Sequence, residues 1–142
     1  LEAVEPSGET DIAETLHRIA DRSKRRGLIV LISDLYGEAD EIIRALHHFR
    51  HRRHELIVFH VLDRAELEFP FRETTAFYDL ETDERIQADP VYVRDEYVAA
   101  VKDFVETFRR ACADAGIDFV SADTSTPYDF LLSRYVAKRG RP

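Results

Sequence analysis

Residues 27–37 read GLIVLISDLYG, and this stretch decides the fold class. An unbroken apolar run, residues 28–32, leads through Ser33 into Asp34 and then into a bend at Gly37. A continuous apolar run of this length, bounded by turn residues, is typical of a strand buried on both faces of a parallel sheet. The carboxylate at the tip of this strand needs an explanation, because its neighbours are too apolar for a purely solvated acid.

Two further stretches repeat the pattern, residues 56–62 and residues 117–122. Amphipathic segments with helical spacing lie between the strands, over residues 38–53 and residues 90–115. Buried strands that alternate with helices predict parallel βαβ units with helices on both faces. We therefore expect an α/β fold, a three-layer, mostly parallel, Rossmann-like sheet, in a single domain over residues 1–142.

Residues 66–88 are inserted between the second predicted strand and the long helix, where a simple crossover connection would need only the helix. Short extended pieces around a polar turn at residues 81–84 predict a small β-hairpin insertion. We expect this hairpin to pack at the edge or rim of the sheet through its aromatic residues, Phe69, Phe71 and Phe77.

The helix ends carry recognisable signals. Thr10 is expected to cap a first helix that continues to Ser23. Thr126 and Pro127 predict an N-cap followed by a proline at the first position of the last helix. Gly116 is expected just beyond the end of the long helix, where a left-handed conformation is common.

Composition excludes several classes of function. The formal net charge of −8 argues against non-specific nucleic-acid binding, which requires a cationic surface. No apolar run is long enough to span a bilayer, so we expect no membrane segment here, which leaves open an anchor in an upstream segment. The only cysteine, Cys112, lies in a helical pattern and is expected in the core. It fits a reducing compartment, so we expect a cytoplasmic location.

Charge is spread unevenly along the chain. Residues 22–53 are rich in arginine, whereas residues 63–96 are strongly acidic. Such asymmetry suits a charged protein partner. Solvated helix faces would explain the same pattern and are the simpler interpretation.

Each predicted strand ends in an aspartate, namely Asp34, Asp63 or Asp123. Parallel neighbouring strands would place the three carboxylates along one rim of the sheet. For Asp63 and Asp123 we favour helix or turn capping, because Asp63 and Glu66 have capping-box spacing.

For Asp34 two functional interpretations compete. A phosphoacceptor pocket would need a lysine at a strand end, and none is there. A divalent-cation site of the von Willebrand factor type A kind would need few protein oxygens, some acting through water.

Several stretches together carry a family resemblance: residues 7–13, 25–35, 54–63, 66–71, 77–82 and 116–119. In these the chain resembles the bacterial family numbered fifty-eight among domains of unknown function, over nearly its whole length. The resemblance implies a von Willebrand factor type A-like fold in the carboxyl-terminal half of the family's proteins. It identifies this chain as the later half of such a domain, truncated at its amino-terminal side.

The resemblance also implies a partial metal-ion-dependent adhesion site. Thr10 matches the threonine of that motif and Asp34 matches the aspartate after its fourth strand. The Asp-x-Ser-x-Ser loop of the motif is absent and would lie upstream of Leu1. We therefore expect no cofactor and an empty partial site in this chain, with Mg²⁺ binding left open for the full-length protein.

Family members are encoded beside MoxR-type ATPases and are thought to act as adaptors. The resemblance therefore implies that this chain is not an enzyme. It implies instead a protein–protein interaction module, with a MoxR-type ATPase as the candidate partner. The alternative is a soluble α/β enzyme of the phosphotransfer type, with an acidic rim at the strand ends.

Four histidines are predicted on one helix: His47, His48, His51 and His54. A zinc site is one interpretation of this spacing. A solvated helix face is the better one, because arginines 50, 52 and 53 disfavour a dication and no aspartate or cysteine joins the histidines locally.

A sheet that lacks its upstream strand leaves residues 28–33 at an edge. This stretch contains no lysine, proline or inward-facing charge that would prevent pairing with another chain. We expect a homodimer through edge strand 28–33, or else coverage of the edge by residues 1–9.

Overall fold

The computed structural model describes residues 11–71, 75–78, 85–88 and 90–140. Its main sheet has three parallel strands in the order β1-β2-β5: β1 (Leu28–Ser33), β2 (Glu55–Leu62) and β5 (Asp118–Asp123). Strand β2 is central and buried almost throughout. The predicted α/β architecture with a parallel sheet is confirmed.

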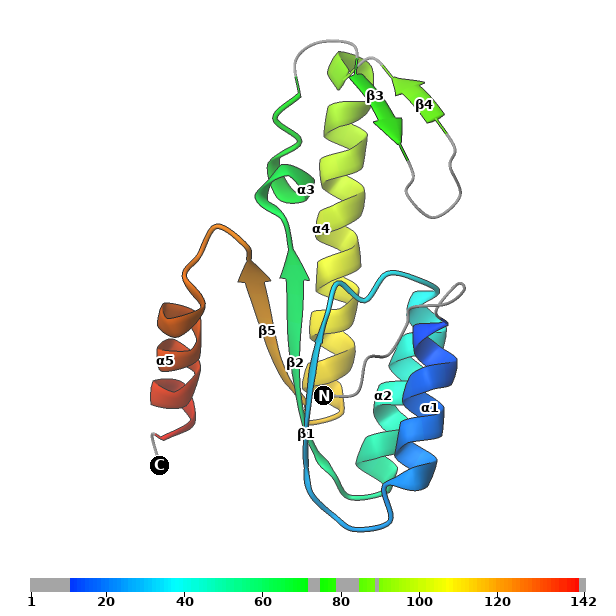
Figure 1. Ribbon diagram of the computed structural model, residues 1–142, viewed down its shortest axis with the longest axis vertical. Helices are drawn as coiled ribbons and strands as arrows, with labels where there is room; N and C mark the ends of the chain where they lie inside the picture. The colour runs from blue at the N-terminus through cyan, green and yellow to red at the C-terminus, as the bar shows by residue number, and fades with distance from the viewer. Residues whose placement is uncertain (1–10, 72–74, 79–84, 89, 141–142) are drawn as a thin grey trace, which may run out of the picture.

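The helices are divided unequally between the two faces of the sheet (Figure 1). On one face lie α1 (Ile12–Arg22), α2 (Ala39–His51) and α4 (Pro90–Asp114). On the other lies α5 (Tyr128–Arg139), whose Tyr135 ring packs edge-on against Phe59 of β2. One face of the sheet is therefore covered by several helices and the opposite face by α5 among the described elements.

The hydrophobic core lies on the face covered by several helices. Its largest fully buried side chains are Phe49 of α2, Phe108 of α4 and Leu35, which follows β1. Ile29 and Leu31 of β1 pack against this core, whereas the alternate residues of the same strand are exposed. The strand is therefore buried on one face only, which differs from the two-sided burial that its unbroken apolar run predicts.

Two helix starts differ from the prediction. Asp11, rather than Thr10, caps α1, and its Oδ1 accepts the Glu14 N–H at 3.0 Å. Thr10 lies outside the described residues. Pro127 is the N-cap of α5, so the predicted proline at the first helical position is wrong. The physical reason is that Thr126 belongs to the turn after β5, where its N–H donates to the Asp123 carbonyl at 2.9 Å.

The inserted segment begins with a helical turn and continues as a hairpin. Helix α3 (Arg64–Glu68) occupies the beginning of the predicted extended region, because a complete capping box at Asp63 starts it. Strands β3 (Thr75–Tyr78) and β4 (Arg85–Ala88) then pair antiparallel, which confirms the hairpin. The polar turn 81–84 and the Phe77 side chain lie outside what the structure describes.

Helix α4 is long and extends beyond the sheet, with the hairpin near its amino-terminal end (Figure 1). The insertion is attached to it through Phe69, whose ring centroid lies 4.8 Å from that of Tyr97 and 5.1 Å from that of Phe71. No helix among the described residues is long and apolar enough to cross a membrane.

Gly116 and Gly27 offer a matched test of this backbone. Gly116 has φ +65°, and an added Cβ would lie 3.4 Å from Nη2 of Arg50, whereas an added Cβ at Gly27 would make only an ordinary contact, 4.0 Å from the Arg25 carbonyl oxygen. We expect Gly116→Ala to lower the free energy of unfolding by about 1–2 kcal/mol, because a left-handed conformation is costly for alanine. Gly27→Ala should stay within about 0.5 kcal/mol of the original chain. Urea unfolding followed by circular dichroism measures both, and equal effects would contradict the assigned helix end.

Candidate functional site

The tip of β1 holds Asp34 in a fixed turn. The Oδ1 of Asp34 accepts the Tyr36 N–H at 3.2 Å, and the Ser33 hydroxyl oxygen accepts the Leu35 N–H at 3.0 Å. Leu35 has φ +57° and a fully buried side chain, an uncommon conformation for a non-glycine residue. The buried leucine therefore anchors the turn and leaves the Asp34 carboxylate exposed.

His60 fixes the same turn from beneath. Its Nε2 lies 2.9 Å from the Asp34 carbonyl oxygen, and because a carbonyl can only accept, Nε2 carries the proton. The imidazole is fully buried among the rings of Phe104, Phe108 and Phe119. Its Nδ1 has no hydrogen-bond partner in the described part of the chain. Burial lowers the pKa of His60 below its usual value, against the raising effect of Asp34.

The three strand-end aspartates are not level with one another. Ser33 pairs with His60, whereas Leu62 pairs with Asp123. Asp34 therefore ends its strand two positions before Asp63, a distance of about 7 Å along the strands at roughly 3.3 Å per residue. The expected continuous rim thus brings together Asp63 and Asp123 but leaves Asp34 apart.

Asp63 and Asp123 act as caps, as predicted. The Asp63 carboxylate accepts the Ala65 N–H at 2.8 Å and the Thr124 hydroxyl at 2.7 Å, and both bonds lower its pKa. The Asp123 carboxylate accepts the Ser125 N–H at 2.8 Å, which is the main cause of its lowered pKa. Each aspartate is therefore explained by the turn that follows its strand.

The described residues do not form a complete magnesium site. Asp34 offers one exposed carboxylate beside the Ser33 hydroxyl, and Thr10 lies outside the described residues. Among the residues that the structure describes, no group of three or more histidine, cysteine or acidic side chains is arranged so that it could hold a metal ion. Mg²⁺ requires about six oxygen ligands, so this arrangement supplies too few.

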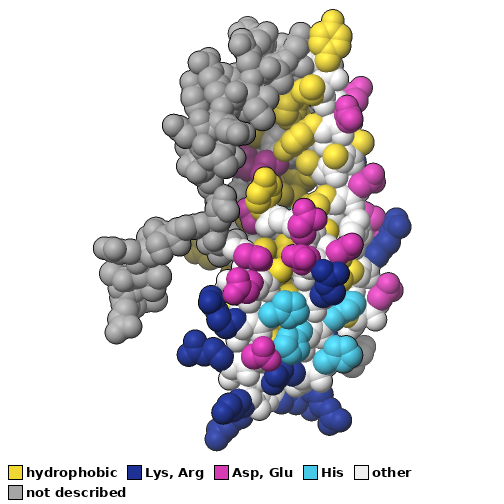
Figure 2. Space-filling view, turned by 90° about the vertical axis from the view of Figure 1, so that its right-hand side faces the viewer, with side chains coloured by type: hydrophobic (Ala, Val, Ile, Leu, Met, Phe, Trp, Pro, Cys, Tyr) yellow, Lys and Arg dark blue, Asp and Glu magenta, His cyan; other side chains and the backbone are white. Residues whose placement is uncertain are grey.

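Histidines gather on the face formed by α1 and α2, where carboxylates lie above them and basic side chains below (Figure 2). His17 of α1 joins this group, with its Nδ1 3.1 Å from the Nδ1 of His48. Arg52 donates from Nε to Nε2 of His48 at 3.1 Å and pairs with Asp21 at 2.7 Å. These contacts fasten α1 to α2, and the Arg52 hydrogen bond engages the Nε2 of His48, a nitrogen with which that histidine would bind a metal ion.

His54 does not belong to that group. Helix α2 ends at His51, and His54 is buried in the loop that follows. Its Nδ1 accepts the Gly27 N–H at 3.2 Å, and its Nε2 lies 3.2 Å from the Ser23 carbonyl oxygen. The prediction of four histidines on one helix was therefore wrong, because His54 links two loops at the amino ends of β1 and β2.

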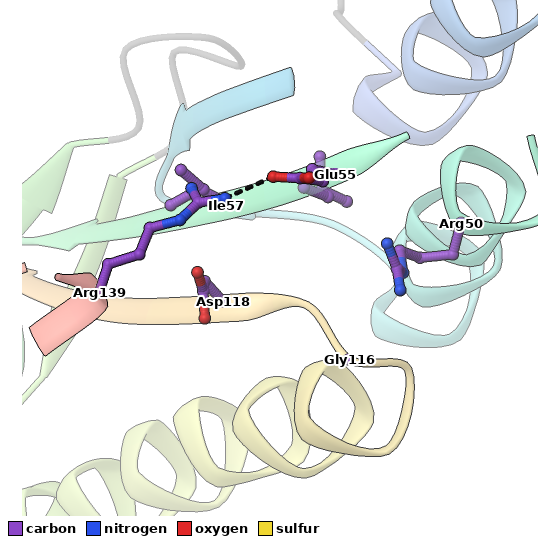
Figure 3. A pocket seen from close by; sticks show the side chains of 7 residues that line it. Arg50, Glu55, Ile57, Gly116, Asp118 and Arg139 are labelled. Carbon is purple, nitrogen blue, oxygen red and sulfur yellow. Dashed lines mark hydrogen bonds and ion pairs between the residues drawn. The ribbon is translucent and has the colours of Figure 1, made fainter. Parts of the chain in front are cut away.

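A polar pocket of about 250 Å³ lies at these amino ends (Figure 3). Arg139 reaches from α5 to Glu55 of β2, and the Tyr135 hydroxyl donates to Asp118 at 2.7 Å. Arg50 approaches from α2 and donates to the carbonyl oxygens of His54 and Ala115, at 2.8 and 3.0 Å. Each of these charged side chains has a hydrogen-bond partner within the chain, and the Arg139 and Tyr135 contacts fasten α5 to the sheet.

The larger hollow is an open apolar groove of about 660 Å³ on the α5 side of the sheet. Its floor is the outer face of β1 and β2, and its wall is the start of α5: Val30, Ile32, Phe59, Val61, Tyr128, Leu131 and Leu132. Ile32 is 69% exposed, and Leu132 is 44% exposed. A contiguous exposed apolar surface of this kind is typical of an interaction site.

The sequence pattern did not identify this groove. The sequence feature that comes nearest to indicating it is the order of strands and helices. Right-handed connections that run in one direction along the sheet place α2 and α4 on the same face, which leaves the opposite face less covered. Residues His60 and Leu132 carried no local motif that would mark them. Only the structure shows which strand residues face α4, as His60 does, and which face α5 and the groove, as Phe59 does.

His60 predicts a specific acid sensitivity of folding. The unfolded chain takes up a proton near pH 6.5, but the folded chain does so only at lower pH. Stability contributed by neutral His60 is therefore lost as pH falls below about 6.5. We expect His60→Gln, which keeps a donor near Nε2, to lose less stability between pH 7.5 and pH 5. His51→Gln, at an exposed histidine, is the control. Unfolding midpoints in urea measure the difference, and parallel pH profiles for the original chain and His60→Gln would refute it.

Comparison with known proteins places the chain among uncharacterised relatives. It is 27% identical over 135 residues to uncharacterised proteins Rv1480 and MT1527 of Mycobacterium tuberculosis and Mb1516 of Mycobacterium bovis. The match covers 92% of this chain and 41% of each relative, so the chain spans about two fifths of their length. No solved structure matches. The family model described as protein of unknown function DUF58 matches residues 1–107, and the chain therefore belongs to the DUF58 family.

Proposed function

We propose that this chain is a non-enzymatic protein–protein interaction module that acts as an adaptor. The observation that carries the proposal is the open apolar groove between the outer face of β1 and β2 and helix α5. Leu28, Val30 and Ile32 expose about half or more of their surface beside this groove. Apolar surface of this extent gains free energy when a partner removes it from water.

The carboxylates at the strand ends give little support to the alternative, a phosphotransfer enzyme. Asp63 and Asp123 use their oxygens as caps, as described above. Lysine occurs at positions 24, 102 and 138, none of which ends a strand of the sheet. A phosphoacceptor pocket of the receiver type would need such a lysine to stabilise the charge of the phosphoryl group.

The proposed partner is a MoxR-type ATPase, and the proposed location is the cytoplasm. The family resemblance supports this partner, and the uneven charge of the chain suits a charged surface opposite it. In the longer proteins of the family, we propose that Mg²⁺ assists binding at Asp34 together with residues upstream. The exposed carboxylate in a fixed turn supports this, although the described residues alone are too few to hold the ion.

The groove can be tested with two changes on one helix. Leu132→Asp places a charge in the groove, whereas Val136→Asp places the same charge one turn further along α5, outside it. With a purified MoxR-type ATPase from the same genome, we expect Leu132→Asp to weaken capture about tenfold or more, since one charge must be desolvated. Val136→Asp should bind like the original chain. Equal capture by both variants, or no capture by the original chain, would contradict the proposal.

Metal binding gives a separate prediction. Because Asp34 supplies too few oxygens, calorimetric titration of this chain with MgCl₂ should show no stoichiometric micromolar site. The same titration with one of the longer proteins of the family should show a site that the change matching Asp34→Ala removes without unfolding. One tight site in the present chain would overturn the account of the β1 tip.

A further inference from the structure

Two neighbouring loops lie at the amino ends of the strands. Residues 23–27 join α1 to β1, and residues 52–54 join α2 to β2. In Figure 1 both loops lie at the end of the long axis away from β3 and β4, and Figure 2 shows basic side chains gathered at this end. Exposed lysine and arginine side chains belong to both loops and to the last turn of α1: Arg22, Lys24, Arg25, Arg26, Arg52 and Arg53. We call these six residues the basic end.

Buried His54 holds the two loops together. Its Nδ1 accepts the Gly27 N–H at 3.2 Å, so the neutral ring carries its proton on Nε2. This Nε2 lies 3.2 Å from the Ser23 carbonyl oxygen, to which it donates. His54 is only 1% exposed. One buried ring therefore fixes both loops, and their cations are presented side by side.

Most of the basic end has no partner within the described part of the chain. Asp21 pairs with Arg52 at 2.7 Å, and Glu55 pairs with Arg139 of α5, so the acids that flank these loops in sequence are engaged. Among the described residues, the other five basic side chains have no ion pair and no side-chain hydrogen bond: Arg22, Lys24, Arg25, Arg26 and Arg53. Positive charge is thus left uncompensated here, although the chain as a whole has a net charge of −8.

Arg53 stands in a conformation that suits glycine better. It has φ +63° just beyond the end of α2, where its N–H donates to the Arg50 carbonyl at 2.9 Å. Glycine is the usual residue at such a helix end, because a side chain makes the left-handed conformation costly. Residues held in unfavourable conformations often serve a function. A role for its positive charge explains an arginine at this position.

The composition of the basic end indicates the kind of partner. Residues 22–27 and 52–53 include no apolar side chain, whereas protein–protein interfaces have an apolar, desolvated centre. Neither of the two hollows described above is lined by these residues, so neither offers them an enclosed site for a small anion. Single-stranded nucleic acid would need aromatic rings for stacking, and a duplex would need a helix or ribbon in its groove. Two exposed loops without these features suit a planar anionic surface.

The acidic part of the chain lies too far away to oppose such a contact. Helix α4 has 25 residues and spans about 37 Å at 1.5 Å per residue. The hairpin lies near its amino-terminal end, whereas its carboxyl-terminal end approaches Arg50 at the amino ends of the strands. Charges in physiological salt are screened over about 8 Å. The acidic segment around the hairpin is therefore screened from a surface that touches the basic end.

We propose that the basic end binds the anionic headgroups of a phospholipid membrane. Contact at the headgroup layer needs no helix that crosses the membrane. Anionic lipids give the cytoplasmic leaflet a negative surface potential, which attracts exposed lysine and arginine side chains. This inference goes beyond the adaptor role, because it uses a different surface and leaves the apolar groove free for a protein partner.

Vesicle binding gives the first test. The chain should sediment with vesicles of equal parts phosphatidylglycerol and phosphatidylcholine, but not with pure phosphatidylcholine, and NaCl should weaken the binding. Lys24→Ala combined with Arg25→Ala should weaken it about twentyfold, since each basic residue near such a surface contributes about fivefold. Lys102→Ala combined with Arg134→Ala removes the same charge from exposed positions of α4 and α5 and is the control.

Three results of that experiment would overturn the proposal. The first is that the original chain does not bind the anionic vesicles. The second is equal binding to the uncharged vesicles, and the third is equal binding by the two double variants.

Arg53→Gly separates a role in binding from a role in folding. Glycine adopts the left-handed conformation freely, so the urea midpoint should not fall, whereas vesicle binding should weaken about fivefold. Unchanged vesicle binding would contradict the proposal, and a lowered midpoint would contradict the strain at Arg53.

Other polyanions distinguish a membrane from the alternatives. At equal concentration of negative charge, poly-glutamate and duplex DNA should bind the chain more weakly than the anionic vesicles do. Tighter binding to either one would overturn the membrane assignment in favour of an acidic protein or a nucleic acid. The basic end and the groove can fail separately, because Leu132→Asp should leave vesicle binding unchanged.

Discussion

Strand β2 is hydrogen-bonded on both sides and buried along nearly its whole length, and the other elements take their positions from it. The backbone N–H and C=O groups of such a strand must find their partners within the protein, since water cannot reach them. Parallel pairing on both sides satisfies the backbone, and His60, the buried polar side chain in its middle, is satisfied at Nε2 by the Asp34 carbonyl. The turn that presents Asp34 is therefore fixed by the central strand as well as by its own residues.

The same constraint produces the unpaired surface. Both crossovers from β1 to β2 and from β2 to β5 run in one direction, so right-handed connections place α2 and α4 on one face. The opposite face is left to α5, and β1 is left with one free edge among the described strands. The acidic side chains at the strand ends and the exposed apolar side chains therefore have different roles in this chain. Its strand-end acids serve the turns, whereas its exposed apolar residues lie where another polypeptide can pair with them.

Much of the fold could be predicted from the sequence, because strand and helix periodicity are local properties. The three strands, the hairpin and the capping role of Asp63 were predicted from short patterns. His54 was not, because its burial depends on loops that meet near Gly27, far away in sequence. Pro127 follows a turn rather than starting a helix, a choice set by the Thr126 bond to Asp123. The groove was not predicted, since it depends on the face of the sheet to which each connection turns.

Site-resolved amide hydrogen exchange of β1 tests the central claim most directly. The amides of Ile29 and Leu31 donate toward β2 and should be protected at every protein concentration. The amides of Leu28, Val30 and Ile32 point away from β2 and should exchange faster than these two amides, because no other described strand pairs with them. The account predicts this alternating pattern along β1. Uniform protection of all five amides would contradict it, because another segment would then cover the edge.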